Sequence, residues 1–370
     1  MVSPTSLKTS VVPATSGPVA QPAAPQKPSL VNKVSSAASH AADAFAGALN
    51  KDLGVLGSAA RKDLLHFPWP GKGSEGRPGW ITRQDPTPTT DVTDQFRTLN
   101  AQASHGEQVL PSDAGKYKYL VIGGLFGKHL PGYMDENVSA LKSQGLDARK
   151  VNVDSDASVE KNAETIRKAI EAASKDGSQV VLIGHSKGGV DAAAALSMHP
   201  ELKDKVRALV AIQSPFGGSP IAQDIETTPI IKPLVNGVVS ELFRGDPKSV
   251  KDLTYDSREK FLAKYPLPTD VPSVSVATSR LSPTSILGSS EEYMKARYGF
   301  PSDGLVDPED AIIPGSHVVR INDMDHAEST VHGVPGFSHY YPKNVTLASV
   351  ALALDAAREH DAAMAPSAGW

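Results

Sequence analysis

The segment 184–189 reads Gly-His-Ser-Lys-Gly-Gly and holds the residues best suited to chemistry in this chain. It follows the apolar run 180–183 and precedes a Gly-Ala-rich stretch with helical character. Such a strand–turn–helix junction needs small neighbours, here Gly184 and Gly188, and it exposes the serine hydroxyl above the sheet. We therefore predict that Ser186 is a nucleophile. The alternative is an incidental serine in a glycine-rich turn.

A serine nucleophile needs a histidine that accepts its proton and a carboxylate that orients the histidine. With this type of turn, the expected chain order is serine, acid, histidine. Asp303 lies in Ser-Asp-Gly-Leu-Val, and His326 follows the next expected strand. We predict Asp303 as the orienting acid and His326 as the general base. The competing acids and histidines are Asp307, Asp310, Asp325, His332 and His339.

Two backbone amides usually bind the negative charge that develops on the substrate carbonyl oxygen. Lys187 directly follows the serine, so its amide is the first expected donor. The glycine-rich segment 123–127 follows an earlier strand, and its Leu125 amide is the expected second donor. A nucleotide-binding loop is the alternative, but the segment lacks G-x-G-x-x-G spacing and the chain has no P-loop.

The elements that must hold these residues alternate between strand and helix from residue 117 onward. Apolar runs predict strands over 117–123, 148–153, 179–183, 206–212, 272–277 and 317–322, and helical spacing predicts helices over 133–144, 158–176 and from 188. This alternation predicts βαβ units, hence an α/β fold with a mostly parallel sheet covered by helices on both faces.

The chain divides into three parts. Residues 1–60 are rich in Pro, Ser and Thr, with no acidic residue before Asp43, so we expect a disordered leader containing an Ala-rich helix over 34–56. Prolines predict an irregular linker over 61–114, and the main domain is expected over 115–362. Such a leader favours a bacterial protein exported without a cleavable signal, secreted or delivered into a host cell. A plastid transit peptide and a cytoplasmic location are the alternatives.

Composition excludes several classes of function. The 37 Lys+Arg and 41 Asp+Glu give a net charge of −4, whereas general nucleic-acid binding needs a basic excess. The chain has no cysteine, which excludes disulfides, thiolate metal sites and cysteine nucleophiles. Its apolar runs are too short for a membrane-spanning helix.

Together these motifs resemble the lipase branch of the α/β-hydrolase superfamily. Bacterial triacylglycerol lipases carry a His-Gly-x-x-Gly loop, a Gly-His-Ser-x-Gly-Gly turn and a later Asp-Gly-Leu-Val followed by Asp-His. In this chain the similar segments are, in the same order, 123–127, 184–189, 303–306 and 325–326. Gly-His-Ser-Lys-Gly-Gly-Val-Asp also resembles a group of plant hydrolases. The resemblance implies an α/β-hydrolase fold and hydrolysis of carboxylic esters. Gly123 and Lys187 depart from the lipase pattern.

Some relatives in that branch bind calcium near the histidine, where Glu328 stands here. No second acid precedes Asp303 at the matching place, so we predict no metal and no cofactor.

Residues 219–271 have helical, amphipathic character, and the resemblance implies a cap over Ser186 that binds an acyl chain and touches a membrane surface transiently. A helix pair filling out the core is the alternative. The expected pocket residues are Phe126, Phe216, Leu234, Val238 and Leu242. The expected substrate is a lipid or other apolar ester. Acyl transfer and thioester cleavage would use the same residues, and the sequence is also compatible with a non-catalytic interaction protein or a lipid-binding protein.

Overall fold

The computed structural model describes residues 76–128, 132–227, 250–281, 287–332 and 340–365. The predicted leader and its Ala-rich helix lie outside these residues, as does the middle of the predicted cap, residues 228–249. Within the described ranges, no helix has both the length and the hydrophobicity that crossing a bilayer requires.

The described strands form one parallel sheet of seven strands in the order β1-β7-β6-β5-β4-β2-β3. The strands are β1 (Thr90–Asp91), β2 (Lys118–Ile122), β3 (Asp147–Lys150), β4 (Val180–His185), β5 (Val206–Ile212), β6 (Ser273–Thr278) and β7 (His317–Ile321). Strand β4 is buried along its whole length because it lies between β2 and β5 with helices on both faces. The predicted α/β architecture is confirmed.

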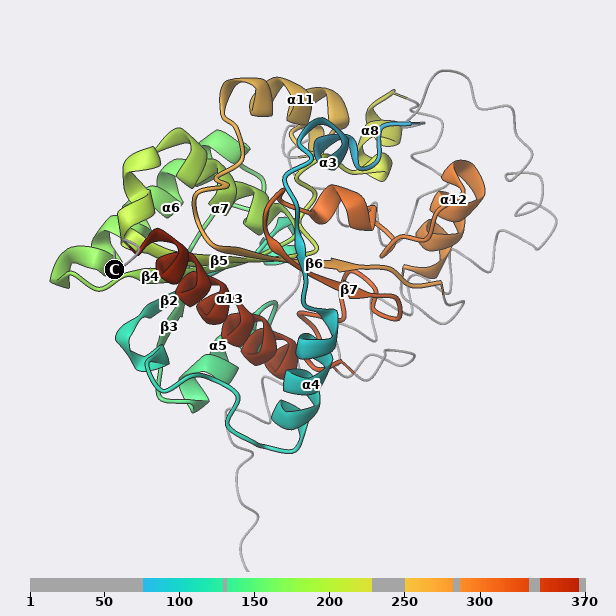
Figure 1. The fold of residues 1–370 in the computed structure, drawn as a ribbon. Coiled ribbons are helices and arrows are strands. Elements are labelled where there is room, and N and C mark those ends of the chain that lie inside the picture. The colour runs from blue at the N-terminus through green and yellow to red at the C-terminus, as the bar shows by residue number, and fades with distance from the viewer. Residues whose placement is uncertain (1–75, 129–131, 228–249, 282–286, 333–339, 366–370) are drawn as a thin grey trace, which may run out of the picture.

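Helices cover the two faces of this sheet (Figure 1). The α-helices are α3 (Trp80–Gln84), α4 (Thr93–Ser104), α5 (Asp135–Ser143), α6 (Val159–Ala173), α7 (Lys187–Met198), α8 (Pro220–Thr227), α11 (Tyr255–Lys264), α12 (Gly288–Tyr298) and α13 (Pro342–Met364). Short 3₁₀ turns lie at Ala114–Lys116, Leu125–Lys128, Ser174–Asp176, Pro200–Lys205 and Pro308–Ala311.

Each face of the sheet has its own hydrophobic core. Helices α4, α5 and α13 pack over one face, and its core includes Phe96, Leu141 and Val181 of β4. Helices α6 and α7 pack over the other face, and its core includes Ile166 and Leu182 of β4. Adjacent residues of β4 thus point into different cores, which explains why the strand reads as a continuous apolar run.

The region predicted as an irregular linker contributes to the main domain instead. Strand β1 pairs with β7, with Thr90 opposite His317, and α4 packs against α13. Phe96 of α4 is fully buried. Apolar residues recur at helical spacing from Val92 through α4, whereas the prolines typical of a linker lie before this helix. The two-residue strand β1 has no sequence signal, because the pairing with β7 determines it.

Helices α8 and α11 lie within the predicted cap, and residues 228–249 between them lie outside the described part. Helix α8 is largely buried, and it contacts both α11 and α12. Tyr255 at the start of α11 is fully buried, with its hydroxyl 2.5 Å from a carboxylate oxygen of Asp310. The described ends of this region are therefore packed on the core, and a cap over Ser186 stays a prediction.

Candidate active site

Ser186 lies on a sharp turn between β4 and α7. Its backbone has φ 55° and ψ −132°, which is strained for a residue with a side chain. The chain reverses tightly there, and a Cβ at Gly188 would lie 2.3 Å from the carbonyl oxygen of Ile122. A Cβ at Gly184 would lie 2.4 Å from the Cα of Gly189. The local packing therefore requires glycine at the positions that the motif predicts.

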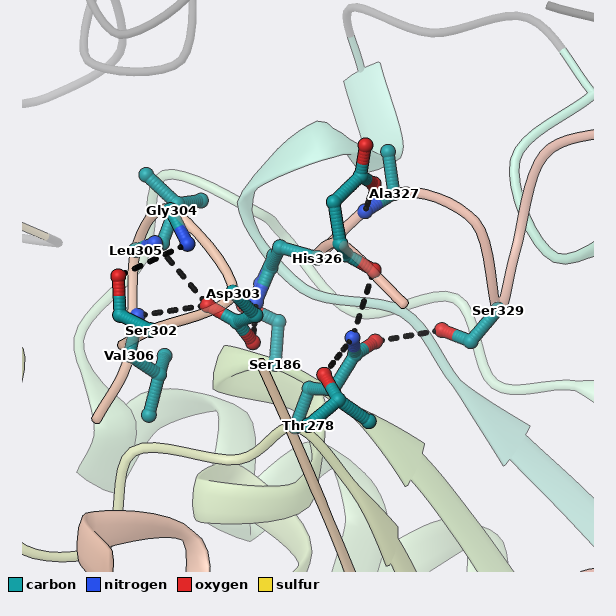
Figure 2. A network of polar contacts seen from close by, with 12 residues as sticks. Ser186, Thr278, Ser302, Asp303, Gly304, Leu305, Val306, His326, Ala327 and Ser329 are labelled. Carbon is teal, nitrogen blue, oxygen red and sulfur yellow. Dashed lines mark hydrogen bonds and ion pairs between the residues drawn. The ribbon is translucent and has the colours of Figure 1, made fainter. Parts of the chain in front are cut away.

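The structure brings Ser186, His326 and Asp303 into one hydrogen-bonded chain (Figure 2). The Nε2 atom of His326 lies 2.8 Å from Ser186 Oγ, and its Nδ1 atom lies 2.8 Å from Asp303 Oδ2. The other carboxylate oxygen of Asp303 accepts hydrogen bonds from the amides of Leu305 and Val306, at 3.0 and 2.8 Å. The carboxylate is thus fixed in place, and the imidazole can accept the serine proton through Nε2.

Elements far apart in the sequence hold these three side chains. The amide of Ser186 donates to the carbonyl of Ile212, at 2.9 Å, which ties the turn to the end of β5. The amide of His326 donates to the carbonyl of Asp303, also at 2.9 Å, so the two loops after β6 and β7 are joined through their backbones as well. All three side chains are almost fully buried.

The three competing acids have other partners. Asp307 accepts a hydrogen bond from the amide two residues further along the chain, and Asp310 contacts the hydroxyl of Tyr255. Burial raises the pKa of Asp307 to about 7, and burial together with the nearby Asp307 raises the pKa of Asp310 well above its ordinary value. Asp325 closes the turn that follows it through the amides of residues 327 and 328.

The two other described histidines near the site, His185 and His332, have partners other than Ser186. His332 is about half exposed, and its ring packs against Tyr341. His339 and His129 lie outside the described residues. His185 is fully buried, and its Nδ1 atom lies 2.5 Å from the hydroxyl of Tyr133. Burial and the neighbouring His326 lower the pKa of His185 well below its ordinary value, so its ring is neutral.

The loop after β2 lies directly against the serine turn. A Cβ at Gly124 would be 3.0 Å from both the amide nitrogen of Lys187 and the Cβ of Ser186. Glycine at this position lets the backbone of the loop approach the first turn of α7. Leu125, the next residue, begins a 3₁₀ turn, and its side chain is buried. The two amides predicted to bind the oxyanion therefore belong to backbone segments in contact.

Gly123 and Lys187, the two departures from the lipase pattern, each have a structural reason. A Cβ at Gly123 would lie 2.7 Å from the ring of Tyr133, so the tyrosine occupies the space beside the loop. The Lys187 side chain turns away into the core, where Nζ lies 2.9 Å from both carboxylate oxygens of Asp191. Both side chains are 1% exposed, and Asp191 also accepts from Asn162, at 2.7 Å.

Asp191 was not predicted from the sequence, although its i, i+4 spacing from Lys187 on a helix is a recognisable ion-pair signal. Burial raises the pKa of Asp191 to about 6, while Lys187 and Asn162 favour its charged form. The pair is thus a buried structural element directly beneath the turn. Because the side chain of Lys187 is held by Asp191, only the backbone of Lys187 is available to Ser186 and its substrate.

Glu328, considered for calcium binding, has a cationic partner within the chain. Its carboxylate is fully buried and forms an ion pair with Arg280. Its second oxygen accepts from the amide of Asp325, at 2.9 Å. Among the described residues, no cluster of three or more acidic or histidine side chains is arranged to hold a metal ion.

The predicted substrate pocket is only partly described. Phe216 is fully buried in the core on the side of α6 and α7. Leu234, Val238 and Leu242 lie outside the described residues, as does the side chain of Phe126. Their role as a pocket stays a prediction.

Comparisons with known proteins agree with this architecture. Residues 135–288 match the family described as the PGAP1-like alpha/beta domain. No curated protein sequence matches the chain.

Solved structures with a similar fold include a metagenomic carboxyl esterase. It is 21% identical with a TM-score of 0.59, and the match covers 72% of this chain and 92% of the esterase. The mature lipase BlEst2 of Bacillus licheniformis is 19% identical with a TM-score of 0.50, over 60% of this chain and 89% of the lipase. At these identities the similarity shows the fold, and the α/β-hydrolase fold predicted from the motifs is confirmed.

Proposed function

We propose that this protein is a serine hydrolase of carboxylic esters. The observation that carries the proposal is the hydrogen-bonded chain from Ser186 Oγ through His326 to Asp303, with 2.8 Å at both contacts of the imidazole. A strained backbone at the serine supports it, because such strain persists where a side chain must be held in one position. The fold shared with a carboxyl esterase and a lipase supports the choice of substrate class.

The proposed reaction has two acyl-transfer steps. In the first, Ser186 Oγ attacks the carbonyl carbon of the ester while His326 Nε2 accepts the hydroxyl proton. Asp303 holds the proton on Nδ1 of the imidazole and stabilises the imidazolium that forms. The amides of Leu125 and Lys187 bind the oxygen that becomes negative in the tetrahedral intermediate.

Collapse of this intermediate breaks the bond to the alcohol, which leaves with the proton from His326. A water molecule then attacks the acyl-serine while His326 accepts one of its protons. The same imidazole returns that proton to Ser186 Oγ, and the carboxylic acid is released. No group other than these side chains and amides is needed for the proton transfers.

We propose that the ester has an apolar acyl chain, since the matched lipase and the amphipathic sequence of the predicted cap favour such a substrate. The test is a series of p-nitrophenyl esters from acetate to palmitate, hydrolysed by the wild type and by Ser186→Ala. We expect turnover of at least the shorter esters, with loss of roughly three orders of magnitude or more in the variant. A folded wild type that hydrolyses no ester of the series would contradict the proposal.

A further inference from the structure

We propose that Gln213 and His185 are positioning residues that hold the backbone on both sides of His326, and this inference rests on the proposed function. The side-chain amide of Gln213 donates to the carbonyl oxygen of Asp325, at 2.8 Å. The Nε2 atom of His185 donates to the carbonyl oxygen of His326 itself, at 2.9 Å. The two peptide carbonyls that flank the Cα of His326 are thus each bound by a side chain from another element.

Gln213 has a strained backbone and lies in a buried position. It directly follows β5, is fully buried and has φ 53°, one of three positive φ values among the described non-glycine residues. Its backbone amide donates to the carbonyl of Val276 in the neighbouring strand, at 2.8 Å. A strained, buried polar residue persists where its surroundings fix it, and such residues gather at functional sites.

The side-chain amide of Gln213 uses both its donor and its acceptor. Nε2 also donates to the hydroxyl of Thr278, at 2.5 Å, and Oε1 accepts from the hydroxyl of Ser329, at 2.6 Å (Figure 2). Oε1 lies 3.0 Å from Nε2 of His185 as well. An amide satisfies this set of partners, whereas a carboxylate would face the Asp325 carbonyl with an acceptor.

The same contacts determine which nitrogen of His185 carries the proton. Nε2 faces two carbonyl-type oxygens, so it is the donor, and Nδ1 must accept from the hydroxyl of Tyr133, at 2.5 Å. That hydroxyl accepts in turn from the amide of Gly124, at 3.1 Å. One network of neutral hydrogen bonds therefore joins the backbone of His326 to the loop that precedes Leu125.

The same hydrogen-bond network therefore holds both His326, the proposed base, and the loop that carries one of the two predicted oxyanion amides. Asp303 orients the ring of His326, but the position of the ring above Ser186 also depends on where the backbone of residues 325–326 lies. A displacement of about 1 Å in a reacting group lowers turnover by roughly 100-fold. Loosening this network is expected to affect kcat, with little effect on the binding of a small ester.

The test compares Gln213→Met, Tyr133→Phe and Tyr119→Phe with the wild type, using p-nitrophenyl butyrate and a thermal melt. Met keeps the length of the Gln213 side chain and removes its hydrogen bonds. Tyr119→Phe is the matched control, because Tyr119 is also fully buried with a hydroxyl bonded to a backbone carbonyl, at 2.7 Å, but lies on β2 away from the network. Active sites are counted with a fluorophosphonate, so kcat refers to folded molecules.

We expect kcat to fall about 10- to 100-fold in Gln213→Met and about 3- to 10-fold in Tyr133→Phe, with KM within about twofold of the wild type. Tyr119→Phe should lower only the melting temperature. Wild-type kcat per active site in the two network variants would overturn the inference, since a merely structural role predicts that result. If Gln213→Met does not fold, the kcat of Tyr133→Phe tests the inference by itself. An inactive, unlabelled wild type would instead refute the proposed function.

Discussion

Replacing Asp307 by Asn should stabilise the protein at alkaline pH and have a smaller effect at acidic pH. Asp307 is only 4% exposed, and burial is the main reason that its pKa rises to about 7 from the ordinary value of 3.8. The nearby Glu309 and Asp303 raise it further, while the amide of Glu309 and the charge of Arg320 act in the opposite direction. The folded protein therefore binds this proton more tightly than the unfolded chain does.

The sign and size of the effect follow from that difference. Because the folded pKa is the higher one, stability decreases as pH rises from about 4 to about 7, and the decrease then levels off. Each pKa unit corresponds to about 1.4 kcal/mol, so ionised Asp307 costs the fold about 4 kcal/mol above pH 7. Asn is neutral at every pH and can still accept the hydrogen bond from the amide of Glu309.

The assay is urea unfolding of the wild type and Asp307→Asn at several values between pH 5 and pH 9. Other titrating groups contribute to both proteins, so the difference between their free energies of unfolding isolates position 307. We expect the advantage of the variant to grow by roughly 3 kcal/mol between pH 5 and pH 8 and then to stay constant. A difference independent of pH, or a variant less stable at pH 8, would refute the reasoning.

Two further substitutions test the surroundings of the serine turn. Asp191→Asn leaves Lys187 buried without its carboxylate partner and should lower the free energy of unfolding by about 3–5 kcal/mol. The double variant Lys187→Met with Asp191→Leu removes both charges and should recover most of this lost stability. Both variants are measured by the same urea titration. Gly124→Ala places a Cβ 3.0 Å from the Lys187 amide and should lower kcat about 10- to 100-fold; Gly115→Ala, which meets nothing within 4 Å, is the control. Equal kcat values in the two alanine variants would contradict the second prediction.

The core of the fold could be predicted from the sequence because its strands are short apolar runs between helices of regular spacing. Strand β5 begins and ends at the predicted residues, 206 and 212, and β4 extends two residues beyond its predicted end. The edge strand β1 could not be predicted, since two exposed residues, Thr90 and Asp91, become a strand only by pairing with β7. Local sequence carries little information about such long-range pairing.

The three residues of the candidate triad could be inferred from motifs, whereas the residues around them could not. Ser186, Asp303 and His326 stand in short patterns whose order is set by the fold, and the structure brings them together. Gln213 and Tyr133 have no pattern of their own. Their contacts join segments more than 50 residues apart, such as Tyr133 and His185 or Gln213 and Asp325, so only the folded chain reveals them.

The most direct test of the proposed function is covalent labelling of Ser186. A fluorophosphonate reacts with a serine hydroxyl that a neighbouring histidine activates, and digestion followed by mass spectrometry locates the adduct. We predict one adduct, on Ser186, in the folded wild type, no adduct in Ser186→Ala and strongly slowed labelling in His326→Ala. A folded wild-type protein whose Ser186 remains unmodified would contradict the assignment of this serine as the nucleophile.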